Sequence, residues 1–201
     1  MSSLGNRLLF ATHNAGKVEE MRALFAPHGV TLVSAQELGL GEPAETETSF
    51  VGNARIKAHA AAQASGLPAL ADDSGLCVDG LDGAPGVYTA DWAEGPGGRD
   101  FMRAMTRTHE ALVSARAPEP WTAQFQCVLV LAWPDGHDEV YEGSVAGRLV
   151  WPIRGKLGHG YDPMFQPDGK RQTFAEMEPS EKNGISHRAR AMQALLAHRF
   201  T

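Results

Sequence analysis

The chain has 201 residues, of which 43% are hydrophobic and 21% charged, a composition typical of a folded globular protein. Its formal net charge of −6 excludes a general affinity for nucleic acids or anionic membranes. No segment approaches the roughly 18 apolar residues of a membrane helix, and residues 1–10 lack a signal-peptide pattern, so we expect a cytoplasmic protein. The length predicts one domain over residues 1–201. Cys77 and Cys127 lie in apolar stretches, which predicts free buried thiols.

The first part of the chain predicts a strand, a helix and a second strand. Residues 7–12 form a short apolar strand, and a loop over residues 13–16 joins it to a helix with apolar residues at helical spacing. Pro27 and Gly29 end that helix. A second strand then covers residues 30–34.

An alanine-rich helix is predicted next, from about residue 49 to residue 65, closed by Gly66 and Pro68. The apolar run at residues 69–71 then predicts a short strand. We expect this strand to end in the motif Asp72-Asp73-Ser74-Gly75.

The remaining residues predict a turn-rich loop, an amphipathic helix, a hairpin of two long strands and a final helix. These elements cover residues 80–86, 99–116, 121–133, 139–151 and 186–200. A Pro-Asp-Gly turn joins the two strands. Because strands alternate with helices early and pair as a hairpin later, we expect a mixed α/β fold, with the active site in a cleft fed by loops at strand ends.

The loop Thr12-His13-Asn14-Ala15-Gly16-Lys17 has the residues of a phosphate site. The start of a helix offers free backbone N–H groups and the positive end of the helix dipole. Lys17 adds a positive charge, Asn14 an amide, and Gly16 room for the backbone to approach a ligand. An ordinary capped turn would use the same residues, and no Walker motif follows. The loop alone leaves both interpretations open.

Three carboxylates, those of Glu45, Asp72 and Asp73, predict a metal site. Adjacent carboxylates at the end of a strand need solvent, a capping role or a cation. Magnesium prefers such oxygen ligands and keeps water for a phosphate substrate, and one carboxylate could take a proton from an attacking water. The alternative is that an aspartate caps a turn at Ser74-Gly75.

Two further segments combine glycines and donors. The loop at residues 154–163 has three glycines, an aromatic residue and an acid before a proline, which indicates a rigid loop on which a flat ligand could lie. In the second segment Ser186 is a candidate N-cap of the last helix, and Lys182, His187 and Arg188 gather donors near that helix start. A structural turn and a cap with solvated charges explain the same residues.

The motifs occur in one order along nearly the whole chain. They are Thr12-x-Asn14-x-x-Lys17, Glu45-Thr46, Ser49-Phe50-x-x-Asn53-Ala54, Ala71-Asp72-Asp73-Ser74-Gly75-Leu76, Gly83-Ala84-Pro85-Gly86-Val87-Tyr88, Gly160-Tyr161-Asp162-Pro163 and Lys182-x-x-x-Ser186-His187-Arg188. Together they resemble the inosine triphosphate pyrophosphatase family. The resemblance implies a hydrolase that converts noncanonical purine nucleoside triphosphates (ITP, dITP and XTP) to the monophosphate and pyrophosphate.

The resemblance also implies roles for individual residues. Asp73 is then the general base, Glu45 and Asp73 hold Mg²⁺ with Asp72 beside them, and Ser74 contacts substrate. The triphosphate is held by Thr12, His13, Asn14, Ala15, Gly16 and Lys17. The nucleoside is flanked by His159, Gly160, Tyr161, Asp162 and Lys182, and its base is read by His187 and Arg188. The family usually has phenylalanine where this chain has His159.

The resemblance also implies an elongated α/β fold with two lobes and a central active-site cleft, and a homodimer, which is the typical assembly of the family. Two other functions remain open: a house-cleaning pyrophosphatase for other modified nucleotides, and a non-catalytic nucleotide-binding regulator. A regulator would need the phosphate loop but not three carboxylates, so the complete acid set argues against it.

Overall fold

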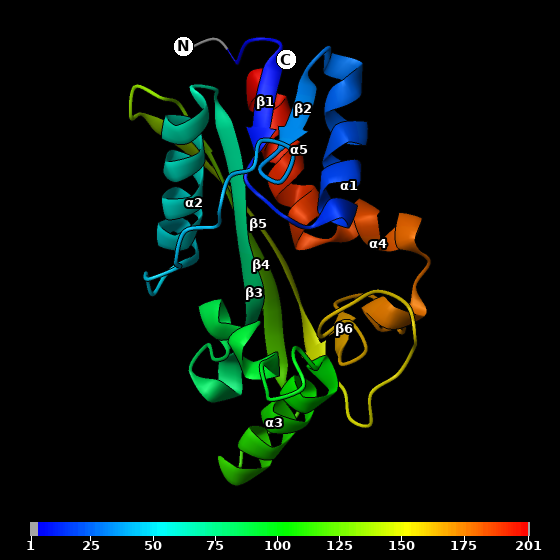
Figure 1. Cartoon of the computed structure of the whole chain (residues 1–201). Coiled ribbons are helices and arrows are strands. Elements are labelled where there is room, and N and C mark those ends of the chain that lie inside the picture. The colour runs from blue at the N-terminus through cyan, green and yellow to red at the C-terminus, as the bar shows by residue number, and fades with distance from the viewer. Residues whose placement is uncertain (1–3, 201) are drawn as a thin grey trace. The chain divides into compact units, whose positions relative to one another are not determined.

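The computed structural model describes residues 4–200 (Figure 1). The chain folds into two compact units. Unit 1 contains the residues up to 73, residues 128–141 and those from 194 onward. Unit 2 contains residues 74–127 and 142–193. The chain therefore passes between the units several times, and each unit is assembled from distant parts of the sequence.

Six strands and five α-helices form the regular structure of residues 4–200. The strands are β1 (Arg7–Phe10), β2 (Thr31–Ser34), β3 (Ala69–Val78), β4 (Thr122–Ala132), β5 (Asp138–Leu149) and β6 (Phe165–Pro167). The helices are α1 (Ala15–Phe25), α2 (Phe50–Ser65), α3 (Phe101–Ser114), α4 (Pro179–Ile185) and α5 (His187–Arg199).

The strands form one mixed sheet in the order β2-β1-β3-β4-β5-β6. The strand β1 pairs in parallel with β2, where Leu8 lies opposite Leu32, and with β3, where Leu9 lies opposite Ala69. The strands β5 and β6 pair antiparallel, with Leu149 opposite Phe165. The parallel pairs come from the alternating strands and helices early in the chain, so the predicted mixed α/β fold is confirmed.

In unit 1, α1 packs beside β2 (Figure 1), and α2 contacts β1. The apolar residues of β1 are fully buried, which explains why this short strand has no polar side after Arg7. Ser49 caps the start of α2 by accepting a hydrogen bond from the Gly52 N–H, and Gly66, with φ of 69°, ends the helix. The predicted bounds of this helix are therefore confirmed to within a residue.

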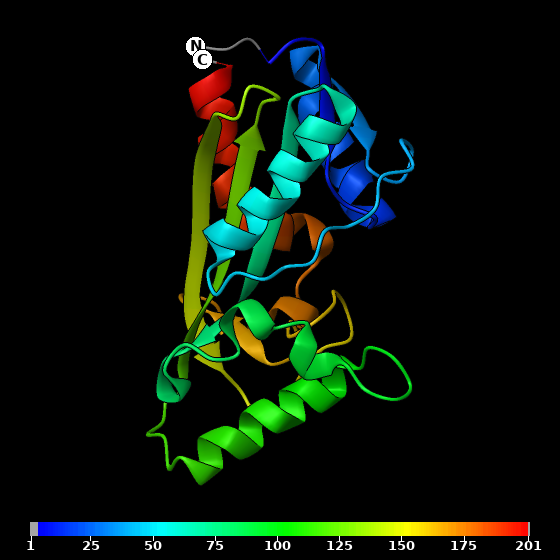
Figure 2. The same ribbon diagram turned by 60° about the vertical axis from the view of Figure 1, so that its left-hand side comes forward.

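In unit 2, α3 lies beneath the 3₁₀ turns of residues 79–93 and is seen along its length in Figure 2. Asp100 caps it by accepting from the Met102 N–H. Its buried residues join a core that includes Leu76, Phe125 and Phe165. The short β6 and α4 were not predicted, because elements of three and seven residues leave little periodicity in the sequence.

The prediction that a strand ends at Asp72 and Asp73 is wrong. The strand β3 runs on through both aspartates to Val78, and no turn interrupts it at Ser74-Gly75. Two carboxylates inside a strand are unusual unless cations compensate them, and lysines from α1 and α2 do so here. Cys77 and Cys127 are free thiols, as predicted, but only Cys127 is buried; Cys77 is half-buried. Within residues 4–200, no helix is both long and apolar enough to span a membrane.

Candidate active site

The loop between β1 and α1 begins the site in unit 1. Asn14 is the N-cap of α1, and its side-chain oxygen accepts a hydrogen bond of 3.1 Å from the Lys17 N–H. The Asn14 N–H in turn donates to the Thr12 hydroxyl over 3.2 Å, and Thr12 is buried. Thr12 and Asn14 therefore shape the start of the helix, where backbone N–H groups suit an anion.

The side chain of Lys17 binds Asp72. Its ammonium donates to both carboxylate oxygens, over 2.8 Å and 3.1 Å. The Asp72 side chain is only 4% exposed, whereas that of Lys17 is 26% exposed. The buried carboxylate therefore anchors a more accessible cation at the loop between β1 and α1, 55 residues earlier in the chain.

A second lysine, Lys57 of α2, brings Glu45 and Asp73 together. Its ammonium lies 2.7 Å from a carboxylate oxygen of Glu45 and 3.7 Å from a carboxylate oxygen of Asp73. Sequence reasoning missed Lys57. The sequence does contain a signal for it: Lys57 lies one helical turn after Asn53, so the alanine-rich helix has a polar pair on one side. Asn53 is buried and accepts from the Glu47 N–H over 2.9 Å.

The electrostatics of this cluster suit a proton acceptor. Burial raises the pKa of Asp73 to about 6, although the positive charge of Lys57 opposes that rise. For Lys57, burial alone would lower the pKa, but the negative charges of Asp73 and Glu45 outweigh it and hold the pKa above its usual value. At neutral pH Asp73 is therefore ionised, yet close enough to its pKa to exchange a proton.

The same carboxylates are chemically suited to magnesium. Glu45 and Asp73 already converge on one cationic atom, the Lys57 ammonium, which shows that their oxygens can share a positive charge. Within residues 4–200 no group of three or more acidic, histidine or cysteine side chains is placed to hold a metal. One or two carboxylates completed by water and substrate phosphates is the usual arrangement for Mg²⁺.

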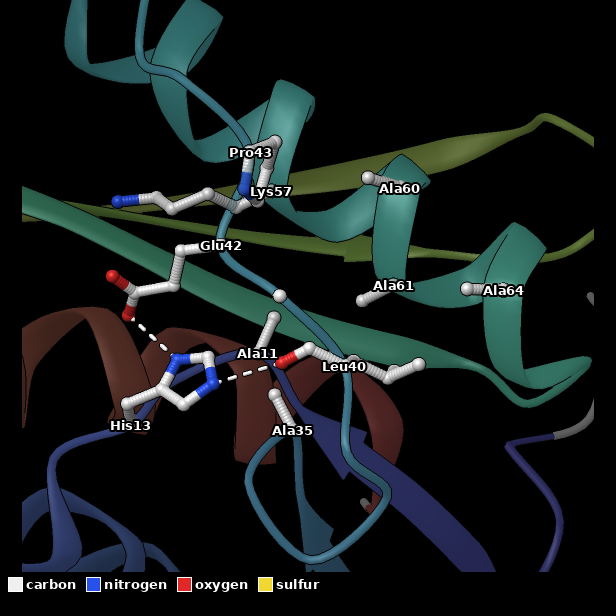
Figure 3. A pocket seen from close by; sticks show the side chains of 11 residues that line it. Ala11, His13, Ala35, Leu40, Glu42, Pro43, Lys57, Ala60, Ala61 and Ala64 are labelled. Atoms are coloured by element: carbon white, nitrogen blue, oxygen red, sulfur yellow. Dashed lines mark hydrogen bonds and ion pairs between the residues drawn. The ribbon is translucent and has the colours of Figure 1, made fainter.

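His13 binds the segment that leads to Glu45. Its Nδ1 lies 2.9 Å from a Glu42 oxygen and its Nε2 lies 2.8 Å from the Leu40 carbonyl oxygen (Figure 3). Both partners are acceptors, so only a protonated ring donates to both. The hydrogen bond with Glu42 raises the pKa of His13, against a smaller opposing effect of burial.

The His13 ring lines a cavity of about 340 Å³ in unit 1. The other lining residues are mainly small and apolar: Ala11, Ala35, Leu40, Pro43, Ala60, Ala61 and Ala64. Since the side chain of His13 is held in this wall, its contribution to phosphate binding would come from the backbone. The phosphate role of residues 12–17 stays a prediction.

In unit 2, the glycine-rich loop is organised around Asp162. This buried carboxylate accepts a hydrogen bond of 2.7 Å from the His159 N–H and forms an ion pair with Lys182. A Cβ at Gly158 would lie 2.1 Å from an Asp162 oxygen, so glycine is required there. The Lys182 ammonium also lies 5.5 Å from the centre of the Phe174 ring. The loop and Lys182, which are 20 residues apart, thus form one unit.

The side chains of this loop face different surroundings. His159 is exposed, whereas the Tyr161 ring is 1% exposed and lies in the core of unit 2. Burial raises the pKa of Tyr161 to about 12. Any contact of Tyr161 with a ligand would therefore involve its backbone. Gly160 has φ of 68°, a conformation that glycine adopts without strain.

The start of α5 is positioned by β5. Ser186 accepts a hydrogen bond of 3.2 Å from the Ala189 N–H, which confirms its predicted capping role. The buried His187 ring stacks on Phe125, with centroids 4.9 Å apart and an interplanar angle of 12°. A Cβ at Gly143 of β5 would lie 2.2 Å from the His187 carbonyl oxygen, so the close approach needs glycine. Ser74 and Arg188 are half-buried.

The predicted residues thus fall into two groups, one in each unit. In unit 1, Lys17 meets Asp72, and Lys57 joins Glu45 to Asp73. In unit 2, Asp162 joins the glycine-rich loop to Lys182, four residues before the cap of α5. Phosphate-competent and acidic residues gather in the first group, and donors with aromatic neighbours gather in the second.

A sequence profile of the Ham1 family matches residues 8–198, which span both groups. The chain belongs to the Ham1 family. A protein of Ruegeria pomeroyi named dITP/XTP pyrophosphatase is 67% identical over 189 residues, covering 94% of this chain and 93% of the relative. A protein of the same name from Mesorhizobium japonicum is 55% identical over 200 residues, covering 94% and 91%.

Solved structures of Ham1 proteins have the same fold. A HAM1 protein from Coxiella burnetii aligns with a TM-score of 0.90 at 36% identity, covering 96% of this chain and 97% of that one. A structure named nucleoside-triphosphatase / dITP/XTP pyrophosphatase, from Mycobacterium abscessus, aligns with a TM-score of 0.78 at 38% identity, covering 94% and 98%. Family and fold are therefore the ones that the motifs predicted.

Proposed function

We propose that this Ham1 protein hydrolyses noncanonical purine nucleoside triphosphates (dITP, XTP and ITP) to the monophosphate and pyrophosphate. The observation that carries the proposal is the cluster of Glu45, Lys57 and Asp73, in which burial raises the pKa of the Asp73 carboxyl to about 6. Relatives named dITP/XTP pyrophosphatase support the substrate class.

In this mechanism the triphosphate binds at the start of α1. Backbone N–H groups after Asn14 and the Lys17 ammonium hold its oxygens, and Asp72 keeps Lys17 in place. Lys57 supplies a second positive charge next to Asp73, the proposed general base. Both lysines already neutralise carboxylates, so each has an ionic partner before substrate arrives.

Asp73 takes a proton from a water molecule as that water attacks the α-phosphorus. A new oxygen–phosphorus bond forms, the bond from the α-phosphorus to the bridging oxygen breaks, and pyrophosphate leaves with the electron pair. Glu45 and Asp73, with Asp72 beside them, would hold Mg²⁺, which when bound would supply positive charge near the triphosphate and the leaving pyrophosphate. No covalent intermediate with the protein is required.

We assign recognition of the base to unit 2. A 6-oxo group on the purine is an acceptor for donors at Lys182, His187 and Arg188, whereas the 6-amino group of adenine is a donor and leaves them unmatched. A buried polar mismatch of this kind costs several kcal/mol. Ser74 contacts substrate in this proposal, and the loop from His159 to Asp162 flanks the nucleoside.

Three properties complete the proposal. We take the metal to be Mg²⁺, the assembly to be a homodimer, and the location to be the cytoplasm, where the nucleotide pool is. The first is supported by the oxygen-only donor set, the second by the family resemblance, and the third by where the substrate pool lies. Sedimentation analysis tests the dimer, and restoration of activity to chelator-treated protein by Mg²⁺ tests the metal.

The function is tested with a panel of nucleotides and Mg²⁺, scoring pyrophosphate against orthophosphate. We expect kcat/KM for ITP, dITP and XTP to be at least about ten-fold higher than for ATP, which lacks the 6-oxo group. We expect the same ratio for GTP, which shares the 6-oxo group and must be rejected at its 2-amino position. Stepwise release of orthophosphate, or equal rates on ATP, would refute the proposal. Preferential hydrolysis of a modified pyrimidine would replace it with the broader house-cleaning function.

A further inference from the structure

The helix α2 carries two polar pairs, each spaced by four residues. The first pair is Asn53 and Lys57, and the second is Arg55 and His59. Residues four apart lie on the same side of a helix, whereas residues two apart are turned by about 200° from one another. The two pairs therefore point to opposite sides of α2.

The first pair faces the acids of the candidate site. The Lys57 ammonium lies between Glu45 and Asp73, and the buried Asn53 accepts from the Glu47 N–H. A hydrogen bond from Asn53 also opposes the rise in the pKa of Asp73 that burial causes. The position of these two side chains thus depends on the rotation of α2 about its axis.

The second pair is held by one carboxylate, that of Asp138 at the start of β5. Arg55 donates to it through two nitrogens, over 3.0 Å and 3.1 Å, and the His59 Nε2 lies 2.8 Å from it. Burial alone would raise the pKa of Asp138, but the hydrogen bonds from Arg55 and His59 outweigh it and hold the pKa below its usual value. A two-pronged arginine bond fixes direction as well as distance.

Beyond its first turn, the apolar contacts of α2 give this helix few other constraints on its rotation. Phe50 and Asn53 are buried in the first turn, and the buried residues that follow are all alanines: Ala54, Ala58, Ala61 and Ala62. Methyl groups bury apolar area but offer no long side chains to interlock with neighbouring elements. Over this part of the helix, the two polar pairs supply the directional contacts.

We propose that Asp138 is a positioning residue for the reaction, which by binding Arg55 and His59 fixes the rotation of α2 and so places Lys57 against Glu45 and Asp73. Asp138 acts through Lys57 and not by its own contact with the carboxylates of Glu45 and Asp73. The proposal rests on the proposed function for its kinetic consequence, but the position of Lys57 is measurable without any substrate.

The kinetic test is a double-mutant cycle in the full chain. Asp138→Ala and the shape-conserving Asp138→Asn are expected to lower kcat/KM for ITP by about ten-fold, a typical cost of a misplaced group. In a Lys57→Ala background the same substitutions should have no further effect. Asp135→Asn is the matched control in the adjacent turn, since the Asp135 side chain is exposed and contacts His137, and it should leave kcat/KM unchanged.

The second readout is the reactivity of Lys57 toward an amine-labelling reagent, quantified by peptide mass spectrometry without nucleotide. The Lys57 side chain is 13% exposed, so we expect slow labelling in the unchanged protein and at least about three-fold faster labelling in either Asp138 variant. Lys17, which Asp72 holds outside α2, is the internal reference and should label at the same rate in all proteins.

The proposal would be overturned if Asp138→Asn lowered kcat/KM by the same factor with Lys57 present and with Lys57→Ala. An unchanged labelling rate of Lys57 in the Asp138 variants would also overturn it. A general loosening of the fold would speed labelling of Lys17 as much as that of Lys57, and this result too would overturn it. Failure of the unchanged protein on the nucleotide panel would refute the proposed function alone, because the labelling comparison needs no turnover.

Discussion

The ammonium of Lys57 in α2 lies 3.7 Å from the carboxylate of Asp73 in β3. The two elements follow one another along the chain, but no sequence pattern predicts that these two side chains form an ion pair. The pair is unequal: burial raises the pKa of Asp73 to about 6 in spite of the nearby cation. Asp73 is thus an ionised carboxylate that the folded protein holds at a cost in stability, which is the usual condition of a catalytic base.

Asp73→Asn is expected to reduce kcat by about a hundred-fold or more, because an amide neither accepts the proton nor carries negative charge. Release of pyrophosphate from ITP measures the loss, and circular dichroism checks that the fold is intact. Asp82→Asn, on an exposed turn, is the control and should retain full activity. If Asp73→Asn keeps activity within about three-fold of the unchanged protein, Asp73 is not the base.

The same substitution should stabilise the protein at neutral pH. A carboxyl whose folded pKa is raised favours folding only while it is protonated, so its charge destabilises the fold above about pH 6. We expect Asp73→Asn to raise the free energy of unfolding by up to about 2 kcal/mol at pH 8, and the difference to shrink as the pH falls toward 4. Denaturant unfolding at the two pH values measures it; a difference independent of pH would contradict the burial argument.

The contact of His13 with Glu42 predicts a small pH-dependent stabilisation. Because the folded pKa of His13 is raised, its contribution is complete below the unfolded pKa of about 6.5 and is lost as the pH rises through the folded value. Both side chains are solvent-accessible, so the contribution is below about 1 kcal/mol. The unchanged protein should unfold at a higher temperature than Glu42→Gln at pH 6 and at the same temperature at pH 9. A constant gap would mean that the histidine is not protonated in the contact.

Arg188→Ala should impair discrimination between ITP and ATP more than Lys17→Ala does. We assign Lys17 to the phosphates, which all these nucleotides share, and Arg188 to the base. The ratio of kcat/KM for ITP to that for ATP should fall about ten-fold or more in Arg188→Ala and stay within about two-fold in Lys17→Ala. If both variants lose activity on the two nucleotides in the same proportion, Arg188 does not read the base.

Gly143→Ala is expected to destabilise the protein by about 1–3 kcal/mol, because the added methyl group would overlap the backbone of α5 at His187 and Ala191. It should also reduce the preference for ITP over ATP, since His187 and Arg188 begin that helix. Gly184→Ala is the matched control, because nothing lies within 4 Å of its added Cβ, and alanine in α4 should be neutral or stabilising. Thermal unfolding and the nucleotide ratio measure both effects; equal behaviour of the two variants would contradict the packing argument.

Much of the secondary structure followed from local chemistry. Ser49 and Gly66 delimit α2, Ser186 caps α5, and the Pro-Asp-Gly turn after β4 closes the hairpin, each where the sequence predicted it. Such signals are readable because caps and turns are satisfied by residues a few positions away. The family was predictable for a related reason: its motifs are short and keep their order along the chain.

The long-range partners could be decided only by the tertiary structure. Residues 72 and 73 resemble the end of a strand because isolated carboxylates are not buried inside one. Only the fold brings Lys17 to Asp72 and Lys57 to Asp73, and these cations let β3 continue to Val78. In the same way Asp138 finds Arg55 and His59 about 80 positions away. The sequence by itself determined which groups of donors and acids the protein has, and the tertiary structure decided their partners, because the energy of a charge pair depends on distance in space and on burial.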